Sequence, residues 1–186
     1  MNIWMIRFDI ARYAGVFLLD RSGNPLEWYE DWPHFEGQKI GEHNFNFNAK
    51  FDLYRPNKVK DIGNFVYCDP GALMCDYYAF VKLKPYINRE IEVLSMNVEG
   101  LTLKVLNVIN VVDCLDRFNS KVSYFDGSQN VMSIEKYIFN TELLKNIGLF
   151  KIPQMARTEI FATDTVRDQV LEYQLTGLEF RLAYSD

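Results

Sequence analysis

Histidine and cysteine are scarce in this sequence of 186 residues, and their scarcity excludes several kinds of reactive site. The three cysteines are Cys68, Cys75 and Cys114, and no two of them form a C-x-x-C pair. An odd number without such a pair predicts neither a zinc site nor a disulfide framework. We therefore expect free thiols in a reducing compartment.

Long apolar runs and a strongly basic balance are also missing. No stretch approaches the ~18 apolar residues that a membrane span needs, and Arg7 and Asp9 interrupt the N-terminal apolar run too early for a signal peptide. The net charge of -5 and the dispersed basic residues argue against nucleic-acid binding. These absences predict a cytoplasmic protein with no membrane partner and no nucleic-acid partner.

The two histidines, His34 and His43, lie near Glu36 and Glu42, so a metal site made of these four side chains can be imagined. Their spacing matches no standard ligand motif, which favours ordinary loop histidines. The sequence also has no glycine-rich phosphate loop after a strand and no G-x-S-x-G motif. We expect no metal, no cofactor and no nucleophilic catalysis, and we assign no catalytic residue.

One pair of carboxylates leaves acid–base chemistry open. Asp113 and Asp116 are three residues apart, which would place them on one side of a helical turn. Aspartates in a short turn more often accept hydrogen bonds from backbone N–H groups, and we favour that interpretation. Asp164 stands at a predicted helix start, where capping is again the better explanation.

Hydrophobic periodicity predicts an α+β fold with a mostly antiparallel sheet built from hairpins and a few helices. We expect helices over 70–83, with Asp69 as N-cap and Pro85 as the stop, over 141–146, and over 164–173 with Thr163 as cap. The length suits a single domain over 1–186. We expect strands over 2–8, 16–19, 44–48, 90–98, 101–108, 121–125, 131–139, 159–162 and 178–184.

Residues 20–50 form an irregular excursion in which aromatic and acidic side chains alternate without a clean period. Tryptophan and tyrosine dominate binding hot spots, and acidic groups accelerate association with a basic partner. The alternative is that these aromatics fold back as a small satellite core. The residues that we expect to bind a partner are Trp28, Tyr29, Glu30, Asp31, Trp32 and Glu36.

Several segments of the C-terminal half resemble a family of polymorphic-toxin immunity proteins called immunity protein eleven, formerly a domain of unknown function. They share its order and spacing, including a closing T-G-x-E-F phrase at 176–180. The resemblance extends over about 70–184. The segments that carry it are 106–116 (LNVINVVDCLD), 137–139, 149–153, 160–164 and 175–180.

The resemblance implies a bacterial protein that neutralises a cognate toxin by direct high-affinity binding, without catalytic residues. It divides the chain into a variable part, 1–65, and a family core, 66–186. Two alternatives stay open: an enzyme that reverses toxin damage with Asp113 and Asp116, and an interaction module unrelated to toxins. The oligomeric state is not indicated.

Overall fold

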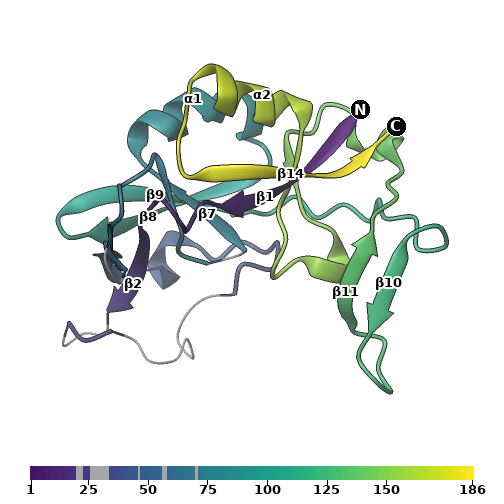
Figure 1. Ribbon diagram of the computed structural model, residues 1–186, viewed down its shortest axis with the longest axis horizontal. Helices are drawn as coiled ribbons and strands as arrows, with labels where there is room; N and C mark the ends of the chain where they lie inside the picture. The colour runs from purple at the N-terminus through teal and green to yellow at the C-terminus, as the bar shows by residue number, and fades with distance from the viewer. Residues whose placement is uncertain (20–22, 26–33, 46, 56–57, 70) are drawn as a thin grey trace.

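The computed structural model describes residues 1–186 except 20–22, 26–33, 46, 56–57 and 70 (Figure 1). Its elements are two α-helices, short 3-10 turns and strands in mostly antiparallel sheets. The predicted α+β class is confirmed. No helix in the described part of the chain is long and apolar enough to cross a bilayer.

The larger sheet has six strands in the order β2-β3-β8-β9-β7-β6. Its centre is the predicted hairpin, which turns at Glu99 and Gly100, both with positive φ, as a tight two-residue turn requires. All neighbours are antiparallel except β3 and β8. The strands are β2 (Gly15–Leu19), β3 (Asn48–Asp52), β8 (Ile91–Val98), β9 (Leu101–Val108), β7 (Ala72–Cys75) and β6 (Phe65–Val66).

The second sheet has four antiparallel strands in the order β12-β13-β1-β14. Its strands are β12 (Leu149–Phe150), β13 (Phe161–Thr163), β1 (Asn2–Phe8) and β14 (Leu178–Ser185). β1 therefore lies between two strands, β13 and β14, that come from the C-terminal part of the chain. A register shift between Ile3 and Trp4 leaves Ala183 as a bulge in β14. Leu182, just before the bulge, is half exposed.

Two small ribbons and three 3-10 turns complete the fold. The second predicted hairpin forms a separate ribbon, β10 (Lys121–Tyr124) with β11 (Val131–Lys136). The other ribbon pairs β4 (Tyr54–Arg55) with β5 (Lys58–Val59). The 3-10 turns are η1 (Glu42–Asn44), η2 (Thr141–Leu144) and η3 (Pro153–Met155), and η2 lies within the predicted helical stretch 141–146.

The first predicted helix is displaced. Helix α1 spans Tyr77–Ile87 rather than 70–83, and Asp76 caps it by accepting a hydrogen bond from Ala79 N at 2.7 Å. Residues 72–75 are instead β7, buried on both faces, which hides the alternation by which a strand is recognised. Pro85 lies inside the last turns of the helix instead of ending it.

Helix α2 (Asp164–Glu172) agrees with the predicted 164–173. Thr163 occupies the N-cap position, but its hydroxyl donates to Ile147 O and makes no cap bond. The Asp164 carboxylate does not cap either, because it accepts hydrogen bonds from Asn2 N and from Trp4 Nε1 of β1. Burial would raise the pKa of Asp164, but these bonds hold it below its usual value.

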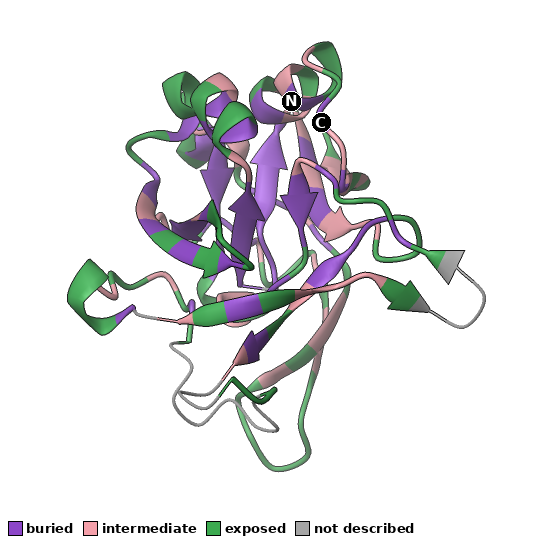
Figure 2. Cartoon of the chain, turned by 90° about the vertical axis from the view of Figure 1, so that its left-hand side faces the viewer, coloured by how far each residue is buried: buried purple, intermediate pink, exposed green. Residues whose placement is uncertain are grey.

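Three apolar clusters of described residues hold the elements together, and Figure 2 shows the buried residues concentrated on the strands beneath the helices. The first joins both helices to both sheets, and includes Leu83 of α1, Val166 of α2 and Ile6 of β1. The second covers the other face of the six-stranded sheet. The third covers the other face of the four-stranded sheet, beneath the β10–β11 ribbon. Alternate side chains of one strand enter different clusters, as Phe161 and Ala162 do.

Three further expectations need correction. The strand expected over 44–48 lies at Asn48–Asp52, because Phe45 is drawn into the second cluster instead of extending the strand. The strand expected over 159–162 begins at Phe161. The stretch 113–116 is not a helical turn; Leu115 forms an isolated bridge with Phe139.

Candidate functional site

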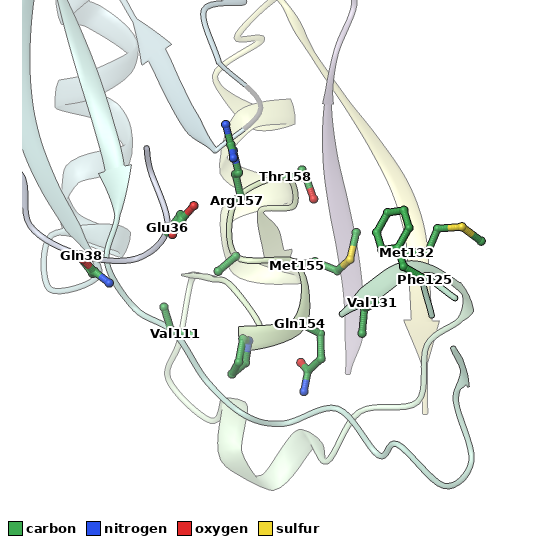
Figure 3. A pocket seen from close by; sticks show the side chains of 12 residues that line it. Glu36, Gln38, Val111, Phe125, Val131, Met132, Gln154, Met155, Arg157 and Thr158 are labelled. Atoms are coloured by element: carbon green, nitrogen blue, oxygen red, sulfur yellow. The ribbon is translucent and has the colours of Figure 1, made fainter. Parts of the chain in front are cut away.

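A hollow of about 620 Å³ opens beside the tip of the β10–β11 ribbon (Figure 3). We call it the hairpin hollow. Its walls come from the ribbon, from the η3 turn with the loop that follows it, and from Glu36 and Gln38 within the aromatic-acidic excursion. Segments far apart in the sequence therefore meet here.

The ribbon side of the hollow is apolar and exposed. Phe125 and Met132 expose 53% and 52% of their surface, and Met155 stands between them and the opposite wall (Figure 3). Methionine is flexible and polarisable, so a surface of this kind adapts to the shape of a partner. Grouped apolar side chains left in water mark interaction sites more often than isolated ones do.

The opposite side of the hollow is charged. Glu36 and Arg157 are exposed and lie on the wall facing the ribbon (Figure 3). Below them, Gln154 donates to Asp113 Oδ1 at 3.2 Å, but its own carbonyl oxygen is buried and has no hydrogen-bond partner among the described residues. A partner would therefore meet apolar anchors on one side and polar groups on the other.

A buried lysine holds the segment that carries Glu36. Lys151 is fully buried beside β12, and its Nζ donates to Phe35 O and to Gly71 O, the latter at 2.7 Å. Burial lowers the pKa of Lys151 to about 8, although the charges of Asp69 and Glu36 oppose this change. Residue 35 is thus fixed from beneath, and Glu36 follows it at the rim.

Two side chains of the central hairpin hold the next residues of the same segment. Asn107 Nδ2 donates to Gln38 O at 2.7 Å and to Glu92 Oε2 at 3.0 Å. The Glu92 carboxylate also accepts from the backbone N–H groups of Ile40 and Gly41, both at 2.8 Å. Burial would raise the pKa of Glu92, but these hydrogen bonds lower it, so the carboxylate stays ionised.

The wall at 35–41 is therefore built before any partner arrives. A surface that is already ordered loses less conformational entropy on binding than a free loop does. Aromatic packing adds to the polar bonds, because the rings of Phe35 and Phe45 lie 6.2 Å apart in the second cluster. We infer that these hydrogen bonds and ring contacts hold residues 35–41 in place.

The structure places only one of the predicted partner-binding residues. Glu36 lies on the rim of the hairpin hollow, whereas the other five lie outside the described residues: Trp28, Tyr29, Glu30, Asp31 and Trp32. Sequence reasoning missed Phe125, Met132 and Met155. The available signal was the pair Tyr124-Phe125 placed directly before a polar turn, where apolar side chains have no core to enter.

The carboxylate pair of the enzymatic alternative belongs to its own loop. Asp116 accepts hydrogen bonds from Asn119 Nδ2 and from the N–H groups of Phe118 and Asn119, as the capping interpretation predicts. These bonds lower the pKa of Asp116, whereas a general base works best with a pKa near the operating pH. Asp113 is paired with Arg117 at 3.1 Å. Both aspartates line a separate hollow of about 390 Å³.

Histidine and cysteine chemistry has little support in the described part of the chain. His34 is exposed, His43 lies in η1, and no group of three potential ligands among the described residues is placed to hold a metal. All three cysteines are free and buried. Burial raises the pKa of Cys114 to about 12, so its thiol stays protonated and is a poor nucleophile at neutral pH.

Residues 99–185 match the model of the Immunity protein family (Imm11). The match confirms the predicted family resemblance over that part of the chain. It includes the β10–β11 ribbon, η3, and both Asn107 and Lys151, which hold the wall at 35–41. No curated protein matches the chain.

Proposed function

We propose that this protein neutralises a bacterial toxin by binding it directly, and that the hairpin hollow is the centre of the binding surface. The match of residues 99–185 to an immunity protein family carries the proposal. The toxin is a protein, and the encounter takes place in the cytoplasm. No covalent chemistry is required, because occupying the toxin's active site or its substrate path is sufficient.

The position of the hollow supports this choice of surface. Its ribbon wall and η3 lie within the family match, while its other wall comes from Glu36 and Gln38 within the excursion. The hollow thus combines residues inside the family match with residues outside it. Lys151 and Asn107, both within the match, hold the wall at 35–41 from below.

The charge of the excursion indicates the chemistry of the partner. Residues 26–36 contain four carboxylates and no lysine or arginine. A toxin that acts on nucleic acid or nucleotides presents a basic surface, which such a segment attracts at long range. We therefore propose a toxin with a basic rim and an apolar side chain that enters between Met132 and Phe125.

Growth protection tests the proposal directly. The proposal expects a toxin gene immediately upstream, and that gene is expressed in a host with the wild-type protein or with the Met132→Glu variant, which places a charge on the apolar wall. We expect wild type to restore growth. The variant should protect less well, because its affinity for the toxin should fall at least tenfold, as happens with substitutions at buried interface centres. Leu171→Glu, on the exposed side of α2, is the matched control and should protect fully.

One further variant separates binding from catalysis, and a second tests the electrostatic part of the proposal. The double variant Asp113→Asn/Asp116→Asn should protect as well as wild type; loss of protection with unchanged toxin affinity would instead establish the enzymatic alternative. Glu30→Lys combined with Asp31→Lys should weaken binding at low salt and less so at high salt. Equal affinity at all salt concentrations would remove the electrostatic part of the proposal.

A further inference from the structure

The outer edge of β14 is open. β14 is the last strand of the four-stranded sheet and pairs only with β1 among the described strands (Figure 1). Its eight residues are long for an unprotected edge, and such an edge is a template for pairing with another strand. The bulge at Ala183 interrupts the strand, so the regular part of the edge is Leu178–Leu182.

The side chains of this regular part are complementary to themselves. If two copies pair antiparallel about a two-fold axis at Phe180, each Glu179 stands opposite the Arg181 of the other copy, and each Leu178 opposite Leu182. Neither Glu179 nor Arg181 has an ion pair among the described residues, and both are exposed. Opposite charges directly across a strand pair stabilise it.

The charges of the sheet continue this alternation. On β1, Arg7 pairs with Glu159 in a bidentate contact with N–O distances of 2.5 and 2.9 Å, and Arg7 is the cross-strand neighbour of Glu179. A second copy would add its Arg181 beside Glu179, giving the order Glu159, Arg7, Glu179, Arg181 across the sheet. In the monomer, no arginine from a second copy lies beside Glu179 to complete this order.

We propose that two copies of this chain associate through β14, joining their four-stranded sheets into one sheet of eight strands. Leu182, which exposes 50% of its surface in the monomer, is covered by Leu178 of the other copy. The proposal is independent of toxin binding.

Sedimentation equilibrium of the full chain, from about 1 to 200 μM, tests the proposal. We expect the mass to rise from 21.8 kDa toward twice that value with concentration. Arg181→Glu places two like-charged pairs in the interface and should weaken dimerisation about tenfold or more. Its cross-strand neighbour in the monomer is Met5, so the substitution creates no new repulsion with β1.

Charge exchange identifies the interface. The single variants Arg181→Glu and Glu179→Arg should each dimerise more weakly than wild type when alone, but an equimolar mixture should form a heterodimer, because every opposing pair is again complementary. The double variant should dimerise by itself. Thermal melting of each variant verifies the fold. A wild type that stays at 21.8 kDa, or single variants that dimerise as well as wild type, would overturn the proposal. Arg181→Glu should still protect cells from the toxin.

Discussion

Replacement of the buried lysine by methionine, Lys151→Met, gives the sharpest test of the physical reasoning. Methionine has a similar volume but leaves the carbonyl oxygens of Phe35 and Gly71 without their buried donor. Each unsatisfied buried acceptor costs about 1–3 kcal/mol. The lysine has a cost of its own, because burial lowers its pKa from 10.5 to about 8.

The cost of burying the charged lysine depends on pH, and it falls as the pH rises. Between pH 8 and 10.5 the unfolded state binds more protons at this lysine than the folded state does, so stability rises with pH. Charging the lysine costs the folded state about 3 kcal/mol at pH 7 and about 1.4 kcal/mol at pH 9.5. Lys151→Met removes this cost at both values.

The prediction compares the free energies of unfolding of wild type and Lys151→Met. The difference, wild type minus variant, should grow by about 2 kcal/mol from pH 7 to pH 9.5. Urea unfolding at the two pH values measures it. The difference between variants cancels the titration of all other groups. Lys145→Met, which removes a surface ion pair with Glu142, is the control and should change stability by less than about 1 kcal/mol. A difference independent of pH would refute the account of Lys151.

Two other predictions concern the backbone and the wall of the hairpin hollow. Gly177 has φ 98°, and an added Cβ would lie 2.1 Å from Phe65 O, so Gly177→Ala should lower the free energy of unfolding by more than about 3 kcal/mol. Gly127→Ala is the matched control, because it has positive φ but open space and should cost about 1 kcal/mol in thermal denaturation. Glu92→Ala should accelerate amide hydrogen exchange at 40–41 by tenfold or more, while unchanged protection there would show that the carboxylate does not hold the wall.

The sequence was most informative where one face of an element is buried and the other is wet. The hairpin of β8 and β9 was predicted almost to the residue, because its turn has a distinctive composition and its side chains alternate. β7 was mistaken for the first turns of a helix, since all four of its residues are buried and no alternation remains. Asp69 and Pro70 supplied a false helix start in front of it.

The candidate site was less accessible to sequence reasoning. A lysine is expected at the surface, so nothing indicated that Lys151 is buried and bonded to two carbonyl groups. The hairpin hollow depends on contacts between segments about a hundred residues apart, and one sequence contains no record of such proximity. The family resemblance located the region of interest, but the residues that form its surface required the three-dimensional arrangement. The division of the chain at residue 65 and the single domain remain predictions.

The pairing of β1 with β13 and β14 has a consequence for the order in which the chain folds. β1 cannot pair until both neighbours have been synthesised, and they follow it by about 160 and 175 residues in the sequence. Contacts of such separation form slowly, and the unpaired strand is exposed meanwhile. The proposed neutralisation of a toxin therefore begins only after β14 has been synthesised and has paired with β1.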